Sequence, residues 1–401
     1  MLPVIMSIPD IGQLLVRCPE YPELTGSIEG NRKEKWITAV FKIPLSSEYK
    51  TIHLSFTPHV LPIPSGFQDE ARWEAVRRGW FNLIQLSCGA SGGSLRVKGV
   101  WANNTLSDPV SSLLYILSDA ACLIPELASG VSTVEILRRA VEYWMYDKIN
   151  EKGLIAYTAK GTPYNEKNRL DKKKNNRQNL MDTNPSVLIG AYCYVRLSGD
   201  IEWLTKHIKH LEFISSYMES RDVDNDGLIE SVQSGNRYSQ PPKDPDCAFD
   251  CFCSGHKNAY INALAYRAWL GLAELERLLG RTDMVRKYLC LARNIKLVYL
   301  STFYNKKTGW LGFWKSEDNE LHDIFTDIPT SIAIDYGIVD VETGRKMLTC
   351  FWNELKRTGF NRFDLGIPLN LRPVPEYEMC YYTPFKSFLN GVCAVSNTAF
   401  F

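Results

Sequence analysis

The chain has 401 residues, which is enough for one large domain or two ordinary ones. Hydrophobic residues make up 45% of it and charged residues 23%, a balance that excludes an intrinsically disordered chain. The formal net charge of +1 gives no electrostatic footprint for nucleic acid or for an acidic membrane surface.

The sequence carries no sign of export or of membrane insertion. No apolar run reaches the roughly 18 residues that a membrane span needs. The first ten residues, MLPVIMSIPD, lack the basic and apolar regions of a secretory signal. The eleven cysteines mostly stand singly. We therefore expect reduced thiols and a cytoplasmic protein with no membrane span and no nucleic-acid partner.

The first 70 residues differ from the rest of the chain. The stretches KWITAVFKIPL and KTIHLSFTPHVL are rich in β-branched and aromatic residues, and a proline- and glycine-containing stretch follows. They predict a few strands in a β-rich N-terminal segment over residues 1–70, the remnant of a β domain. Apolar residues at helical spacing then indicate a helix over residues 70–86. We expect residues 71–401 to form a separate, helical domain.

Helix signals dominate the remainder of the chain. Proline in a first turn, capping-box spacing and glycine after a last turn mark successive boundaries. Long polar loops at 152–181 and 231–255 follow alternate helices and predict a lined mouth on one side. The apolar, uncapped end GVCAVSNTAFF predicts that closing helices are missing. The predicted helices cover residues 109–127, 132–149, 184–197, 201–219, 259–279, 283–304, 328–336 and 341–356, with a last one beginning near Phe385 or Gly391.

One stretch resembles a known group of enzymes. It begins MDTNPSVLIGAYCYVRLSGDIEW, continues to the turn DVDNDGLIES and ends with AFDCFCSGHKNAYINALAYRAW. These motifs resemble those of the six-hairpin toroid glycosidases, closest in pattern to non-lysosomal glucosylceramidases and the amylo-glucosidase part of glycogen debranching enzymes. The resemblance implies a mainly α fold, an (α/α)6 toroid that is incomplete at its C-terminus. It also implies a glycoside hydrolase that cleaves a glucoside-type bond of a small carbohydrate without a cofactor.

Glycoside hydrolysis usually needs two carboxyl groups, an acid for the leaving oxygen and a nucleophile or base. By the resemblance, Asp250 takes the acid/base role, and its apolar neighbours favour a raised pKa. Asp246 is the second choice, and a helix cap is the alternative interpretation of Asp250. Glu376 is the predicted partner. Glu378 and Glu166 remain open, as does a glutamate beyond Phe401 of the kind that inverting relatives use.

Sugar-binding sites stack sugar faces on aromatic rings and use polar side chains for the hydroxyls. Tyr164 and Trp314 fall in predicted loops where such stacking can occur. Asp182, Asn184 and His256 stand at predicted helix starts that face the presumed mouth. For Asp182 and Asn184, helix capping is an equal alternative.

The remaining polar clusters predict no metal site. The turn from Asp222 to Gly227 imitates the first half of a calcium loop, but Gln233 stands where an EF-hand needs its bidentate glutamate. Cys247, Cys251, Cys253 and His256 lack the repeated spacing of structural zinc. Two alternative functions stay open: a glycoside phosphorylase, and a non-catalytic carbohydrate-binding toroid.

Overall fold

The fold was analysed in a computed structural model of the whole chain. It describes residues 4–8, 12–18, 25–31, 36–42, 53–58, 110, 113, 118, 126–128, 131–155, 180–236, 246–247, 249, 252–361, 367–379 and 393–394. The chain divides into two compact units, one formed mainly by Met1–Tyr146 and the other mainly by Gly199–Phe401 with Asp147–Tyr157 and Pro163–Val195. The predicted boundary near residue 70 lies inside the first unit and stays a prediction.

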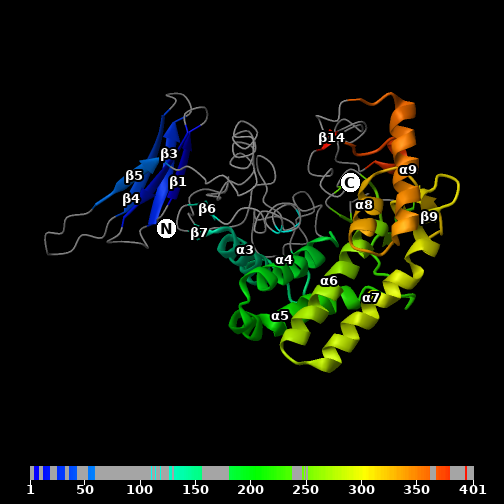
Figure 1. The fold of residues 1–401 in the computed structure, drawn as a ribbon, viewed down its shortest axis with the longest axis horizontal. Coiled ribbons are helices and arrows are strands. Elements are labelled where there is room, and N and C mark those ends of the chain that lie inside the picture. The colour runs from blue at the N-terminus through cyan, green and yellow to red at the C-terminus, as the bar shows by residue number, and fades with distance from the viewer. Residues whose placement is uncertain are drawn as a thin grey trace. The chain divides into compact units, whose positions relative to one another are not determined.

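The first unit contains the predicted strands (Figure 1). An antiparallel sheet has the order β1-β2-β5, with Val4 opposite Val16 and Leu15 opposite Thr57. A separate hairpin pairs β3 with β4, in which Ile28 lies opposite Ala39. The β-branched stretches noted in the sequence thus form strands, as predicted. The bounds are Val4–Ile8 (β1), Gly12–Arg17 (β2), Thr25–Asn31 (β3), Trp36–Lys42 (β4) and Ser55–Pro58 (β5).

Two predicted helices before residue 150 differ in detail. The short strand β6 (Glu126–Ala128) pairs with β7 (Val131–Ser132) where the helix over 109–127 was expected to end. The helix predicted over 132–149 is α3 (Thr133–Glu142), which continues as the wider π-helical turn η2 (Tyr143–Asp147). The helix expected over 70–86 lies outside the described residues.

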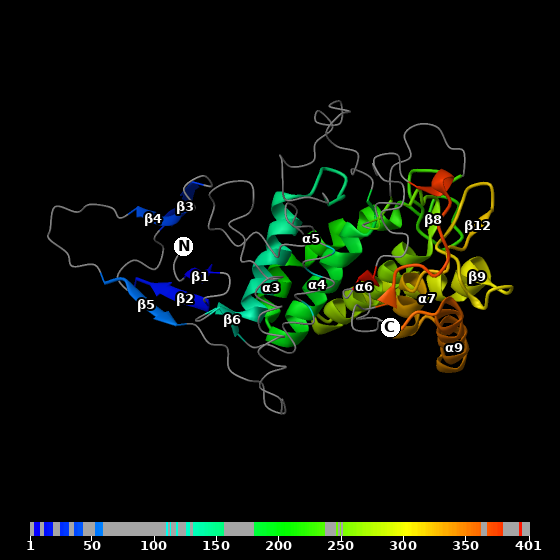
Figure 2. The ribbon, with the colours of Figure 1, turned by 90° about the horizontal axis from the view of Figure 1, so that it is seen from above.

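Six helices of the second unit alternate between two kinds of burial. In α6, 15 of 20 residues are buried, whereas in the following helix α7 only 5 of 22 are. The same contrast separates α4 from α5 and α8 from α9. We call α4, α6 and α8 the inner helices and α5, α7 and α9 the outer helices (Figures 1 and 2). Their bounds are Thr183–Ser198 (α4), Ile201–Glu219 (α5), Ala259–Leu278 (α6), Thr282–Phe303 (α7), Ile328–Asp335 (α8) and Val341–Thr358 (α9).

The hairpin of α6 and α7 shows how the sequence fixes these elements. The side chain of Asn258 accepts hydrogen bonds from the N–H groups of Tyr260 and Ile261, which caps α6. Gly280 has a left-handed φ of +70°, which suits glycine and lets the chain reverse into α7. At the far end of the pair, the Tyr299 hydroxyl donates to the Ala259 carbonyl at 2.8 Å. The periodicity and the glycine at 280 had predicted this pair.

Short strands and loop contacts hold the segments that precede α4 and α6. The N–H of Met181, just before α4, donates to the Asp246 carbonyl at 2.7 Å, and the N–H of Ala259 donates to the Phe313 carbonyl at 2.9 Å. A three-stranded sheet, ordered β12-β11-β8, lies at the start of α6. It is formed by Lys257–Asn258 (β8), Trp314–Lys315 (β11) and Leu321–His322 (β12).

The end of the chain corrects one prediction. Cys393–Ala394 form the strand β14, which pairs antiparallel with β13 (Ile367–Pro368), where a closing helix from Phe385 or Gly391 was expected. An apolar run of this length fits a short strand as well as a helix turn, so its composition alone could not separate the two. The 3₁₀ turn η5 (Glu376–Glu378) lies between β13 and β14 in the chain.

Candidate active site

Asp246 is the best-connected acid at the inner helix ends. Its side chain is fully buried and accepts hydrogen bonds from the Ser254 hydroxyl and, at 3.1 and 3.3 Å, from the Asn258 amide. Burial raises the pKa of this carboxyl, although these hydrogen bonds oppose the rise. Because Asn258 also caps α6, its hydrogen bonds to Asp246 connect residue 246 to the first turn of an inner helix.

A second buried acid stands before α8. Asp327 is fully buried and does not cap the helix, and among the described residues neither carboxylate oxygen has a hydrogen-bond partner. The hydroxyls of Thr330 and Ser331 in the first turn are also buried without a partner there. Burial raises the pKa of Asp327 well above its ordinary value. The sequence indicated only a helix start at this point, so this acid was missed.

Asp182 and Asn184, predicted to contact sugar, are both buried at the start of α4. Asp182 holds the N-cap position without a side-chain cap, and its carbonyl accepts from the Ser186 hydroxyl at 2.7 Å. The Asn184 amide donates to the carbonyls of Gly153 and Ile214, and its oxygen accepts from the N–H of Ile155. Asn184 therefore joins α4 to α5 and to a neighbouring turn, and sugar binding by either residue stays a prediction.

The other predicted residues differ in their burial and contacts. His256 is partly buried with a positive φ of 52°, and burial lowers its pKa. Trp314 is buried in β11, where its ring stacks on His322 and its N–H donates to the Gly235 carbonyl at 3.0 Å. Glu376 is exposed in η5. Asp250 and Tyr164 lie outside the described residues.

Glu378, two residues beyond Glu376, is buried and contacts the imidazole of His322 at 2.8 Å. Its backbone carbonyl accepts from the N–H of Cys253, which stands three residues after Asp250 in the sequence. This buried contact was missed because its partners lie 56 residues apart and no local pattern joins them.

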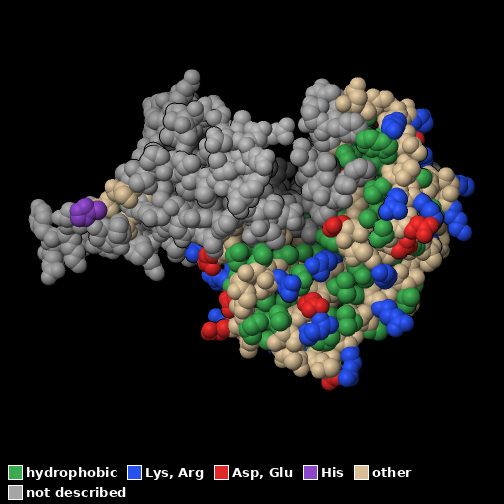
Figure 3. Space-filling view, viewed as in Figure 1, with side chains coloured by type: hydrophobic (Ala, Val, Ile, Leu, Met, Phe, Trp, Pro, Cys, Tyr) green, Lys and Arg blue, Asp and Glu red, His purple; other side chains and the backbone are tan. Residues whose placement is uncertain are grey.

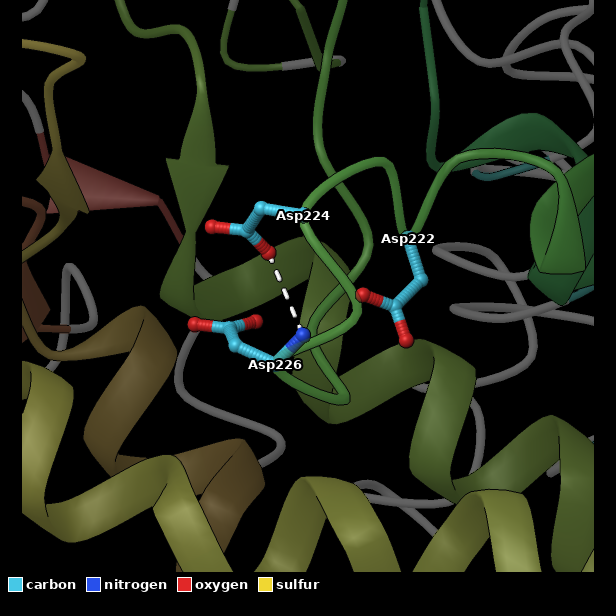
Figure 4. Close-up of side chains that lie close together, drawn as sticks. All are labelled: Asp222, Asp224 and Asp226. Atoms are coloured by element: carbon cyan, nitrogen blue, oxygen red, sulfur yellow. Dashed lines mark hydrogen bonds between the residues drawn. The ribbon is translucent and has the colours of Figure 1, made fainter.

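The calcium-like turn is neutralised by a lysine from the strand β8. Asp222, Asp224 and Asp226 are the group of described residues that could hold a metal ion (Figure 4). The ammonium of Lys257, however, lies 2.5 Å from Asp224 and 2.6 Å from Asp226. Although burial opposes its charge, these hydrogen bonds raise the pKa of Lys257. The lysine thus neutralises the two carboxylates and ties the turn to the start of α6.

The described surface offers no further indication of a ligand class. On the face in Figure 3, basic and acidic side chains are interspersed with apolar ones over the described helices. Among the described residues, every helix is too short or too polar to cross a bilayer.

A buried carboxyl group therefore stands at or beside the start of each of the three inner helices. Asp182 precedes α4, Asp246 is bonded to the cap of α6, and Asp327 precedes α8. The raised pKa values of Asp246 and Asp327 favour the protonated form, which can donate a proton or a hydrogen bond. A raised pKa of this kind is a property that general acids share.

Two solved structures of rhamnosidases are similar to this chain. The rhamnosidase from Klebsiella oxytoca with rhamnose bound matches with a TM-score of 0.52 at 10% identity, over 82% of this chain and 65% of that one. The GH78 family rhamnosidase of Bacillus sp. GL1 matches with a TM-score of 0.50 at 10% identity, over 89% of this chain and 41% of that one. The chain thus spans less than two thirds of the length of either relative.

No protein-family model matches the sequence, and no curated protein does. At 10% identity the structural likeness concerns the fold alone. It confirms the predicted mainly α-helical fold class, and the pairs of inner and outer helices are consistent with an α/α toroid.

Proposed function

We propose that this chain is the helical part of a glycoside hydrolase. The observation that supports the proposal is that a fully buried acid stands at or beside the start of each inner helix, two of them with raised pKa values. An acid that protonates a glycosidic oxygen must keep its proton near neutral pH, and burial is the usual means. The toroid-type fold, shared with two rhamnosidases, supports the class of reaction by analogy.

In this proposal Asp250 is the general acid, as the sequence resemblance implies. Asp246 stands four residues before Asp250 in the sequence, and the hydrogen bond from Ser254 ties residue 246 to residue 254, which follows Asp250. Burial raises the pKa of Asp246 and so favours its uncharged form, while the hydrogen bonds that it accepts oppose this rise. We assign Asp246 a positioning function.

The proposed substrate is a small carbohydrate with a glucoside-type bond. Because the similar structures are rhamnosidases, rhamnosides are the first alternative to test. The experiment is hydrolysis of aryl α- and β-glycosides of glucose, xylose, galactose and rhamnose by the full chain and by Asp250→Asn. Asp283→Asn is the matched control, since Asp283 is 95% exposed on the outer helix α7.

We expect Asp250→Asn to lower kcat by about 100-fold or more with unchanged circular dichroism, and Asp283→Asn to keep full activity. Full activity in Asp250→Asn would move the acid to another carboxyl, with Asp246 next. Sugar binding without turnover of any glycoside would favour the non-catalytic toroid. Neither binding nor turnover would overturn the proposal.

A further inference from the structure

Three polar side chains at the start of the inner helix α8 share one face of its first turn. Asp327 has helical backbone angles, and its carbonyl accepts from the N–H of Ser331 at 2.9 Å. Residues three and four positions apart lie on the same side of a helix, so Asp327, Thr330 and Ser331 form one stripe. The other residues of α8 before Asp335 are apolar. We call these three side chains the α8 polar stripe.

The α8 polar stripe is buried without hydrogen-bond partners. At most 1% of each residue is exposed, and among the described residues nothing bonds to the carboxyl oxygens of Asp327 or to the hydroxyls of Thr330 and Ser331. Thr183, the first residue of the inner helix α4, is equally buried, but its hydroxyl donates to the Ile155 carbonyl at 3.0 Å. A buried polar group without a partner costs free energy, so the stripe calls for a functional explanation.

Contacts on both sides hold the chain that leads into the stripe. Thr326 pairs with Asn370 in an antiparallel bridge, and its carbonyl accepts from the indole N–H of Trp310 at 2.5 Å. Phe325 has a left-handed φ of +51°, which a non-glycine residue keeps only when its surroundings hold it there. Its ring stacks on that of Trp310. The position of Asp327 is therefore fixed by the fold, although its own side chain takes no part in these contacts.

The chemistry of the stripe fits the hydroxyl groups of a neutral ligand. A hydroxyl can both donate and accept a hydrogen bond, and so can a protonated carboxyl. Burial raises the pKa of Asp327 well above its ordinary value, and no described cation opposes the rise, so the protonated form is favoured. A cation would need acceptors instead of donors. An anionic group would find no positive charge beside this acid within the described part of the chain.

We infer that Asp327, Thr330 and Ser331 bind the hydroxyl groups of a neutral sugar, and that sugars bearing a carboxylate or a phosphate are excluded from this position. The inference rests on the proposed function, which supplies a carbohydrate as the substrate, but it does not depend on Asp250. In the free chain the stripe is closed off from solvent, so neighbouring side chains must move when a sugar reaches it. The sugar hydroxyls then supply the hydrogen bonds that the stripe lacks.

The test measures the binding of glucose, xylose, galactose, rhamnose and glucuronate to the full chain by titration followed by NMR. Thr330→Val and Ser331→Ala each remove one hydroxyl with little change of shape, and Asp327→Leu removes the carboxyl. Thr349→Val is the matched control, because Thr349 is exposed on the outer helix α9. Thermal unfolding of Thr330→Val and of Thr183→Val compares a buried hydroxyl without a partner to one with a partner.

We expect the native chain to bind at least one neutral sugar and to reject glucuronate. Each hydroxyl variant should weaken the binding about three- to tenfold and Asp327→Leu about tenfold or more, while Thr349→Val keeps it. Thr330→Val should unfold at the temperature of the native chain or above it, because it loses no hydrogen bond. Thr183→Val should unfold at a lower temperature, because it leaves the Ile155 carbonyl without its donor.

Unchanged sugar binding in the stripe variants, equal binding of glucuronate, or no binding of any neutral sugar would overturn the inference. So would a loss of stability in Thr330→Val as large as that in Thr183→Val, because its hydroxyl would then have a partner, such as a water molecule, in the free chain. Stabilisation by sodium or potassium chloride that Asp327→Leu lacks would assign the stripe to a cation instead. Weakened binding without hydrolysis of any glycoside would leave the inference standing while the proposed function fails, and hydrolysis with unchanged binding would do the reverse.

Discussion

The two ends of helix α6 bury carboxyl groups equally but surround them differently. At its N-terminal end, the fully buried Asp246 has a hydroxyl and an amide as partners. At its C-terminal end, the fully buried Glu276 lies 3.0 Å from the guanidinium of Arg281, which also contacts Glu212 at 2.5 Å. Burial raises the pKa of Glu276 to about 7, with Arg281 opposing the rise and Glu212 adding to it.

This difference teaches that burial alone does not identify a catalytic acid. Burial without a cation favours the protonated form of a carboxyl, whereas a cation can hold one of two neighbouring carboxylates in the charged form. Accordingly, the pKa of Glu212 is lowered: burial works against this, but Arg281 and Lys209 outweigh it. We assign the first end of α6 to the proposed site, where Asp246 has a positioning function, and a structural function to the second.

The largest effect is expected when Arg281, the cation at the C-terminal end of α6, is replaced. Arg281→Met leaves Glu212 and Glu276 side by side, and we expect a loss of about 2–4 kcal/mol in the free energy of unfolding at pH 8. The loss should be smaller at pH 5, where Glu276 is protonated. Urea unfolding followed by circular dichroism measures it. Arg277→Met is the control, because Arg277 makes only an exposed pair with Glu274; an equal loss in both variants would contradict the comparison.

The next largest effect disturbs the N-terminal end of α6. A Cβ on Gly255 would meet the backbone nitrogen of Gly235 and lie 2.7 Å from the carbonyl of Gln233. Because backbone cannot move aside cheaply, Gly255→Ala should cost about 2–3 kcal/mol and lower activity by displacing the segment after Asp250. Gly280 lies at the other end of α6, and a Cβ there would meet nothing within 4 Å. The cost of Gly280→Ala therefore comes from the left-handed φ alone, and we expect a loss of about 1 kcal/mol in the free energy of unfolding. The reverse order in thermal unfolding would show that the 255 segment is loosely packed.

The sequence predicted the helices of the second unit because their signals are local. Apolar spacing and the glycine at 280 placed α6 and α7 to within one residue at each boundary. The strand at Cys393 was mistaken for a helix since a short apolar run carries no period. Trp314 was expected in a loop, but pairing with β8 and β12 draws it into a sheet.

The site was less predictable because its chemistry depends on contacts between distant segments. Asp327 and Asp340 both precede a helix, yet only Asp340 caps one, by accepting from the N–H of Thr343, while Asp327 is buried. The contact of His322 with Glu378 likewise depends on how two loops pack. No residue pattern distinguishes these cases before the helices assemble.

A smaller effect tests the uncompensated acid before α8. Burial raises the folded-state pKa of Asp327 above its unfolded value, so stability falls as pH rises from about 4 towards that folded pKa. Asparagine has no charge to lose. We therefore expect Asp327→Asn to be more stable than the native chain by about 1–2 kcal/mol at pH 8, with the difference vanishing below pH 4. Asp340→Asn, whose exposed carboxyl has a lowered pKa from its hydrogen bond to Thr343, should show no gain at pH 8. A gain common to both variants would point to net charge instead of burial.

The smallest effect tests whether Glu276, at the C-terminal end of α6, is protonated or forms an ion pair with Arg281. The pKa of Glu276 rises from 4.5 to about 7 on folding, so the native chain loses stability as pH increases across that window. Glu276→Gln should remove this slope and gain about 1 kcal/mol or less at pH 8, because the lost contact with Arg281 offsets part of the relief. Thermal unfolding at pH 4, 6 and 8 measures the slope directly. A loss of stability at pH 8 would mean that Glu276 is charged and paired with Arg281. The guanidinium would then hold two carboxylates, those of Glu212 and Glu276. In that case the two ends of α6 would differ even more in charge.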